Sequence, residues 1–229
     1  MNKETSSPFI SYPKQAAFGR VLPKSKIYDH SGASSAVREM FVRQVEQIVW
    51  QYKLAPETIN LPSKPSVPEI EIFTVDLKTP ELNHEVLRCI DGAVQFPIIF
   101  ELNFEGETKV IAAFKRLSES DSNRWVLSDY FSSQWEANDC LRMPMPHAID
   151  LAALYEQLLE RLIPLQLRQN ENLIELVKRV EQLRLKENEA LKIISKLAKE
   201  KQFNRKVEIN SKLREIRQEL ANLATKKRD

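Results

Sequence analysis

Residues 96–117, FPIIFELNFEGETKVIAAFKRL, decide the fold class because they contain two strand-like segments separated by a short turn. FPIIFELNF and TKVIAAFKRL are rich in β-branched and aromatic residues, which favour strands over helices. The turn EGE places Gly106 where a tight hairpin needs a positive φ. We therefore expect an antiparallel hairpin here.

The segments on either side extend this hairpin into a sheet. Residues 69–77, EIEIFTVDL, alternate apolar and polar side chains, which is typical of a strand with one wetter face. Residues 81–94 have helical spacing, and Asp91-Gly92 is a plausible left-handed helix stop. Residues 124–135 supply a third strand of the meander. The sequence predicts an α+β fold with a small mixed four-stranded sheet packed by helices.

Two further helices are expected around the sheet. Residues 35–54, SAVREMFVRQVEQIVWQYKL, carry apolar side chains at helical spacing after a serine N-cap. Residues 151–163, LAALYEQLLERLI, follow Asp150 as N-cap and present a broad apolar stripe, so we expect this helix to pack on the sheet.

The chain divides by composition into three parts. Residues 1–33 are rich in proline and serine and indicate an extended N-terminal arm, and residues 34–163 form the α+β globular domain. Residues 164–229 form a basic helical arm, since residues 171–229 carry 16 Lys and Arg against 10 Asp and Glu. Such a division indicates a globular body with an appendage for an anionic partner or for solvent.

The arm has an interrupted apolar pattern. Apolar residues repeat at three-four spacing over residues 171–198, and a second series begins at Ile209 out of phase with the first. Two structures fit this change: a stutter in one continuous coiled-coil helix, or a reversal near residues 202–206 that makes a helical hairpin.

Residues 199–214, KEKQFNRKVEINSKLR, lie at this change and are the candidate binding segment. Their cations could bind nucleic-acid phosphate or a partner protein, or could be a solvated helix face paired with Glu200, Glu208 and Glu215. Phe203 could stack on a base or fill the helical seam. The candidate residues are Lys199, Lys201, Phe203, Arg205, Lys206, Lys212 and Arg214.

The sequence lacks the motifs of several kinds of catalytic and cofactor-binding site. The four glycines are too far apart for a phosphate-binding loop, and Cys89 and Cys140 lack the spacing of a zinc site. The three histidines share no HxxxH or HExxH pattern. We therefore expect no cofactor and no metal, and a soluble, cytoplasmic protein is the default because no long apolar segment or secretion signal occurs.

One enzymatic alternative is a divalent-metal nuclease. Asp76 and Lys78 have the acid-x-Lys form, in which carboxylates hold Mg²⁺ and a lysine stabilises the attacking group. Glu101 and Lys115 on the later strands would complete such a site. Alternatively, Lys115 is a strand-end lysine, or it pairs with Glu101 across the hairpin.

The chain resembles a bacterial domain family of unknown function. The resemblance runs from about Val21 and rests on VEQIVWQYKLAPETINL, VPEIEIF, FPIIFEL with KVIAAFKR, DLAALYEQLLERLI and KEKQFNRKVEINSKLR. The family pattern falls on Trp50, Tyr52, Lys53, Leu54, Pro56, Glu57, Glu69, Ile70, Phe73, Lys115, Lys201, Gln202, Phe203, Asn204, Lys206 and Asn210. Members are encoded near DEAD-box or Snf-type helicase-like ATPases and type III-like DNA methyltransferases, which implies a role in restriction or antiphage defence.

Three hypotheses follow. The first is a non-enzymatic accessory subunit that joins a helicase-like ATPase or a DNA methyltransferase, with DNA as a further ligand, and with Tyr52, Lys53 and Glu57 as a surface site. The second is the nuclease. The third is a structural homo-oligomer formed through the C-terminal helices. No membrane partner is expected.

Overall fold

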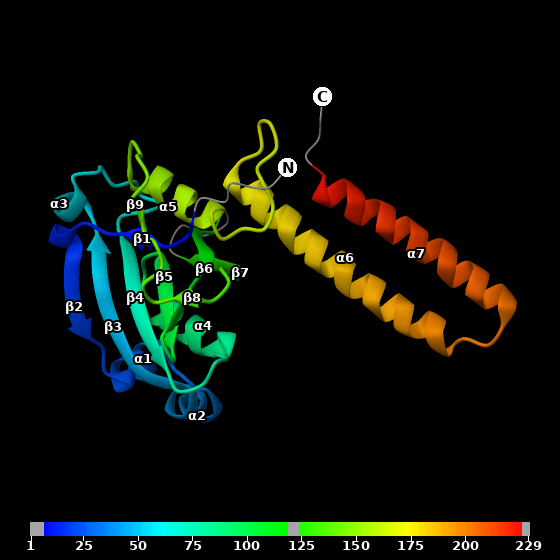
Figure 1. Ribbon diagram of the computed structural model, residues 1–229, viewed down its shortest axis with the longest axis horizontal. Helices are drawn as coiled ribbons and strands as arrows, with labels where there is room; N and C mark the ends of the chain where they lie inside the picture. Colours follow the sequence, from blue (N-terminus) through cyan, green and yellow to red (C-terminus); the bar gives the residue numbers. More distant parts are fainter. Residues whose placement is uncertain (1–6, 119–123, 226–229) are drawn as a thin grey trace. The chain divides into compact units, whose positions relative to one another are not determined.

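The computed structural model describes residues 7–118 and 124–225, and the chain divides into a unit that ends at Ile163 and a unit that begins at Pro164 (Figure 1). The first unit contains a mixed sheet with helices, and the second consists of helices. The α+β class and the helical C-terminal region are therefore confirmed. Each unit is described by itself.

The sheet has seven strands rather than the four expected. Its order is β2-β3-β4-β5-β6-β7, and β8 pairs with β6. β4 and β5 are parallel, whereas the other neighbours on this path are antiparallel. The bounds are Ala17–Val21 (β2), Val45–Leu54 (β3), Ile70–Leu77 (β4), Ile98–Phe104 (β5), Glu107–Leu117 (β6), Trp125–Ser132 (β7) and Glu136–Ala137 (β8).

The helix expected over residues 35–54 is half wrong. Only α2 (Ser35–Gln44) is helical, capped by the Ser34 hydroxyl, and the chain then continues directly into β3. β3 has register shifts between Val45 and Gln47 and between Trp50 and Tyr52. A β-bulge adds a residue to one strand, so buried positions such as Val45 and Ile48 fall three apart and imitate a helical period.

The hairpin of β5 and β6 is confirmed. Glu105 and Gly106 both have positive φ, 46° and 87°, and Phe104 pairs with Glu107 across them. Two left-handed residues in a two-residue loop match the right-handed twist of the strands. The hairpin packs one face against α4 (His84–Ala93), the helix that connects the parallel strands β4 and β5.

α4 is capped differently from the sequence prediction. Its N-cap Asn83 accepts from the Glu85 amide at 2.9 Å, and Val86, Leu87 and Ile90 enter the core of this sheet face. Gly92 is helical rather than left-handed, and the chain leaves the helix at the extended residue Val94. The last turn is held instead by a side chain from the sheet, described below.

The opposite face of the sheet is covered by α5 (Leu151–Glu160). Asp150 caps α5 through the Ala153 amide at 2.9 Å, as expected. The Tyr155 ring stacks on Phe114 at 6.2 Å between centroids, and its hydroxyl donates to the Ala113 carbonyl at 2.8 Å. Both faces of the central strands are therefore buried, and β4 does not have the wetter face that its alternation predicts.

Residues within the segment expected as an extended arm take part in the fold. β2 is the edge strand beside β3, and α1 (Lys24–Ser31) packs near α4. β1 (Ile10–Ser11) pairs in parallel with β9 (Met143–Pro144) to form a second, two-stranded sheet. A 3-10 turn (Lys14–Ala16) and α3 (Pro56–Ile59) complete the elements of this unit.

The second unit is a helical hairpin, so the chain reverses and the register change is not a stutter. α6 (Leu173–Lys199) and α7 (Phe203–Ala224) are joined by residues 200–202 (Figure 1). Their seam contains Ala190, Leu213 and Ile216, with Ile193, Leu197 and Leu220 against them. Among the helices of the described residues, none has an apolar stretch long enough to cross a membrane.

Candidate functional site

The predicted binding segment lies at the turn of the hairpin. Lys199 ends α6, Lys201 is in the turn, and the other predicted cations lie on α7. Lys212 pairs with Glu189 of α6 at 3.5 Å. Across residues 7–118 and 124–225, no direct ion pair is found for the remaining five cations: Lys199, Lys201, Arg205, Lys206 and Arg214. Arg205 attracts Glu200 at longer range.

Exposed apolar side chains accompany these cations. Phe203 does not fill the seam, because it is 78% exposed, and Val207 one turn later is 53% exposed. On α6, Leu191 is 63% and Ile194 43% exposed. We call these four residues the tip patch.

Helical geometry places the tip patch on one side of the hairpin. At about 100° per residue, Leu191 and Ile194 lie about 100° and 40° around α6 from the seam residue Ala190. By the same rotation of about 100° per residue, Phe203 and Val207 lie about 80° and 120° around α7 from the seam residue Leu213. Because α6 and α7 are antiparallel, equal rotations point to the same side, so the patch is contiguous.

The four residues of the nuclease hypothesis do not come together. Asp76 and Glu101 share one sheet face, where Asp76 accepts from the Asn103 amide at 3.0 Å and both oxygens of Glu101 accept from Arg142 at 2.8 and 2.9 Å. Lys78 donates to the Val42 carbonyl at 3.1 Å and pairs with Glu46 at 3.4 Å. Within the described part of the chain, no group of three His, Cys, Asp or Glu side chains is placed to hold a metal ion.

Lys115 lies on the other face of the sheet and is a structural residue. It is 2% exposed, and its ammonium donates to the carbonyls of Asp91 and Val94 at the end of α4. It is neither a strand-end lysine in solvent nor a partner of Glu101, which faces Val110 in the register. The Asp91 carboxylate, 3.9 Å away, accepts from the Tyr130 hydroxyl at 2.5 Å.

The expected surface site at the end of β3 is also engaged internally. Lys53 pairs with Glu57 of α3 and with Glu69, each at 2.9 Å, and hydrogen bonding to these carboxylates raises the pKa of Lys53. The Tyr52 ring contacts Tyr12 at 5.1 Å between centroids. These contacts join β3, α3 and the start of β4.

A polar cavity of 440 Å³ opens on the sheet face that carries Glu101. Tyr12, Tyr52, Thr74 and Arg142 line it together with Glu101. The charges here are already paired, and hydrogen bonding to Glu101 raises the pKa of Arg142. The polar groups of this cavity therefore stabilise one another.

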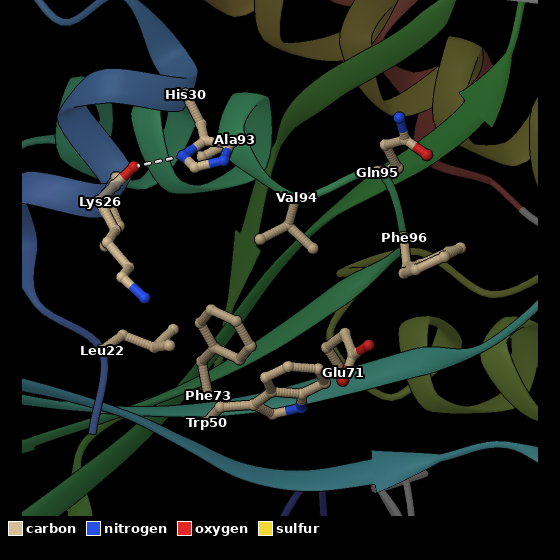
Figure 2. Close-up of a pocket in the computed structure, with 11 residues that line it drawn as sticks. Leu22, Lys26, His30, Trp50, Glu71, Phe73, Ala93, Val94, Gln95 and Phe96 are labelled. Atoms are coloured by element: carbon tan, nitrogen blue, oxygen red, sulfur yellow. Dashed lines mark hydrogen bonds between the residues drawn. The ribbon is translucent and has the colours of Figure 1, made fainter. Parts of the chain in front are cut away.

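The sequence interpretation missed a second cavity, of 420 Å³, on the α4 face of the sheet (Figure 2). Glu71 of β4 lines it, although this side chain was interpreted as part of a wet strand face. Glu71 is 1% exposed, and neither of its carboxylate oxygens has a hydrogen-bond partner. Burial raises the pKa of Glu71 to about 9, and the neighbouring Glu69 adds to the shift.

One signal in the sequence could have identified Glu71. It stands between Ile70 and Ile72, in a strand whose next residues are Phe73 and Val75. An acid within so apolar a strand is more often buried than the alternation alone indicates, if strands lie on both sides of it. The structure meets that condition, because β3 pairs with β4 on one side and β5 pairs with it on the other.

Comparison with known proteins gives a family and no function. A family profile described as "Domain of unknown function (DUF4391)" matches residues 10–220. No curated protein and no solved structure matches the chain.

Proposed function

The chain belongs to the DUF4391 family, and from this premise we propose that it is a non-enzymatic accessory subunit of a bacterial restriction or antiphage defence system. It binds a helicase-like ATPase or a DNA methyltransferase through the helical hairpin of α6 and α7. The system is suggested by the family resemblance described above. The binding role is suggested by the surface of the hairpin.

The tip patch is the observation that carries the binding role. Phe203 and Val207 expose most of their surface and do not take part in the seam between α6 and α7. Exposed apolar side chains gathered on one side, with a polar rim, are typical of protein interaction sites. The unpaired Lys201, Arg205 and Lys206 beside them favour a partner surface with an apolar centre and acidic residues around it.

DNA is a second ligand of the same hairpin in this proposal. The five cations without ion pairs are available to phosphate, and each phosphate contact adds a salt-dependent contribution to affinity. We expect such binding to be weak and to orient the assembly on DNA, whereas the apolar contact holds the partner protein.

The experiment is a binding measurement with purified proteins. The full chain is mixed with a helicase-like ATPase and, separately, with a type III-like DNA methyltransferase, the kinds of protein that the resemblance implies, and binding is measured by biolayer interferometry. We expect the Phe203→Asp, Val207→Asp double variant to reduce affinity at least about tenfold, or about 1.4 kcal/mol. Undiminished affinity of this variant would overturn the role of the tip patch.

A matched control separates the patch from general surface hydrophobicity. Leu141 is 81% exposed and lies outside the hairpin, so Leu141→Asp makes the same chemical change at another apolar surface position. We expect this variant to bind as the unaltered chain does. Equal losses in both variants would instead indicate a nonspecific effect of the added charge.

Two further measurements test the alternative hypotheses of a nuclease and of a structural oligomer. Cleavage of plasmid DNA with Mg²⁺ or Mn²⁺ that is lost in Asp76→Ala would restore the nuclease hypothesis. A dimer in light scattering that dissociates in the double tip variant would mean that a second copy of the chain covers the patch. We expect neither result.

A further inference from the structure

The cavity beside Glu71 combines a buried acid with aromatic walls. Its lining residues that matter here come from α1, β3, β4 and the connection from α4 to β5: Lys26, His30, Trp50, Phe73 and Phe96. Figure 2 shows the Glu71 carboxyl beside the Trp50 ring, on the side toward Phe96, with Lys26 and His30 at the far end. The volume of 420 Å³ is that of a small-molecule site.

The isolation of the Glu71 carboxyl is the central observation. A buried carboxyl without a hydrogen-bond partner costs free energy, so folded proteins rarely keep one. The nearest cation by register, Lys53 of β3, is opposite Glu71, but its ammonium binds Glu57 and Glu69 instead. The Trp50 indole N–H donates to the Tyr52 carbonyl at 3.2 Å. The Lys53 ammonium and the Trp50 indole are thus used elsewhere, although the neighbouring Glu69 and Trp50 side chains still influence the pKa of Glu71.

We propose that this cavity binds a nucleobase with an amino group beside a ring nitrogen, as in adenine or cytosine, and that Glu71 recognises that edge. The proposal is independent of the hairpin and of the partner proteins discussed above.

The protonation state of the acid fits this ligand. A neutral carboxylic acid has one O–H donor and one carbonyl acceptor side by side. The amino group of such a base donates to the carbonyl oxygen of the acid, and the unprotonated ring nitrogen accepts from the acid O–H. Both oxygens of Glu71 thus gain a partner, and no charge is buried. An organic cation would instead require ionisation of a carboxyl that the apolar surroundings keep neutral.

The aromatic walls fit the faces of such a base. Trp50, Phe73 and Phe96 surround the acid, and stacking of a base on an aromatic side chain contributes about 1–3 kcal/mol. Trp50 and Phe96 are half-buried, and Phe96 lies on the short connection between α4 and β5. Because the Glu71 oxygens are closed off from solvent, we expect the Phe96 ring to turn aside when a base enters.

The far end of the cavity fits a phosphate or another anion attached to the base. Lys26 lines this end beside His30, whose Nδ1 lies 2.7 Å from the Lys26 carbonyl oxygen. A proton on Nδ1 would make that bond and leave the other ring nitrogen as an acceptor. Lys26 is therefore the residue expected to distinguish a nucleotide from the corresponding nucleoside.

Calorimetric titration of the full chain tests the proposal. The probes are AMP, CMP, UMP and GMP, together with the corresponding nucleosides. We expect AMP and CMP to bind more tightly than UMP and GMP, because the acid donates more strongly to the basic ring nitrogen of adenine or cytosine than to the carbonyl oxygen of uracil or guanine. Absence of binding by all eight probes at millimolar concentration would overturn the proposal.

Variants of Glu71 separate recognition from folding. Glu71→Gln keeps one donor and one acceptor, so affinity should stay within about threefold, or about 0.6 kcal/mol. Glu71→Leu removes both and should weaken binding at least about tenfold while the protein stays folded by circular dichroism. Asp76→Asn, on the same strand but facing the opposite way, is the matched control and should bind normally. Equal affinity of Glu71→Leu and the unaltered chain would contradict the assignment.

Two further readouts examine the charge arrangement. Lys26→Ala should weaken nucleotide binding about fivefold or more, or about 1 kcal/mol, with little change for the nucleoside. The binding enthalpy of the nucleoside should be the same in Pipes and Tris buffers, since no proton leaves Glu71. Proton release on binding, or tighter binding of tetramethylammonium than of any base, would identify a cation site and overturn the proposal.

Discussion

The Lys115 ammonium donates to the main-chain carbonyl of Asp91 at 2.7 Å and stands 3.9 Å from the carboxylate of the same residue. One side chain of β6 thus binds both the backbone and the side chain of the last turn of α4. Burial lowers the pKa of Lys115 and raises the pKa of Asp91 to about 6, while their mutual attraction opposes both shifts. This contact replaces the glycine stop that the sequence indicates.

Removal of this lysine should destabilise the first unit strongly. Lys115→Met leaves the Asp91 carboxylate buried without its cation and removes a donor from two carbonyls, so we expect a loss of about 3–5 kcal/mol in the free energy of unfolding. Urea denaturation monitored by fluorescence checks this value. Lys192→Met, at an exposed position of α6, should change stability by less than about 0.5 kcal/mol. A similar small change for Lys115→Met would mean that the pair does not stabilise the fold.

Glu71 should make stability fall as the pH rises. Its pKa is about 9 in the folded protein and about 4.3 in the unfolded chain, so between these values the folded state holds one more proton. Stability conferred by that proton is complete below about pH 4.3 and is lost as the pH approaches 9. The slope is at most about 1.4 kcal/mol per pH unit.

Glu71→Gln isolates this effect, because glutamine does not titrate. Unfolding free energies at pH 6.5 and 8.5 should show the variant gaining about 2.5 kcal/mol on the unaltered protein over this interval. The pKa of Asp91 lies below the interval and contributes little. A constant difference between the two proteins would show that Glu71 is ionised throughout.

Arg179 should hold the open end of the hairpin together. Its guanidinium binds both oxygens of Glu171 at 2.7 Å, the Gln166 carbonyl at 2.7 Å and the Leu223 carbonyl of α7 at 3.0 Å. Lysine cannot reproduce this planar fork. In Arg179→Lys we expect amide exchange in residues 220–225 to accelerate about tenfold or more, corresponding to about 1.4 kcal/mol of lost local stability. Arg217→Lys, at an exposed position of α7, is the control, and unchanged exchange in Arg179→Lys would contradict the prediction.

A DNA contact through the hairpin should have a defined salt dependence. If the five unpaired cations each contact a phosphate, the slope of log affinity against log salt concentration is about −4.5. Replacing Arg205 and Lys206 by alanine should make that slope shallower by about 2, as measured by fluorescence anisotropy on a duplex. Replacing the exposed Lys178 of α6 should leave it unchanged, and a slope that does not respond to the double replacement would place DNA elsewhere.

The sequence predicted those parts of the fold that local chemistry determines. The β5–β6 turn has two left-handed residues, and the glycine of Glu105-Gly106 predicts such a turn. The N-cap Asp150 and the apolar stripe that follows it predict α5. β3 was misjudged because its bulges shift the buried positions to a spacing of three, and the period is the main signal in a single sequence. Because the residues of β3 were predicted to be helical, β2 had no strand to pair with, and the sheet was predicted with four strands rather than seven.

The candidate sites depended on relationships that no local pattern contains. Asp76 and Glu101 share a face because the register pairs Glu101 with Thr74, two residues before Asp76. Lys115 is on the other face because it is an odd number of residues from Val110, the partner of Glu101, along an alternating strand. The isolation of Glu71 requires knowing that Lys53 pairs with Glu57 and Glu69. The candidate binding segment, in contrast, was predicted from its charge, and its binding role stays a prediction.

The turn of the hairpin carries a carboxylate at its centre as well as cations. Glu200 Oε1 accepts from the amides of Lys201 and Gln202 at 2.8 and 2.9 Å, and hydrogen bonding to Gln202 lowers the pKa of Glu200. A fixed negative charge thus stands between Lys199 and Lys201. A uniformly anionic surface, such as a duplex backbone, is repelled by the Glu200 carboxylate. A protein surface that carries one cation surrounded by acidic residues is attracted both by Glu200 and by the neighbouring lysines. If the hairpin binds a partner as proposed, we therefore expect it to discriminate by charge pattern rather than by total charge.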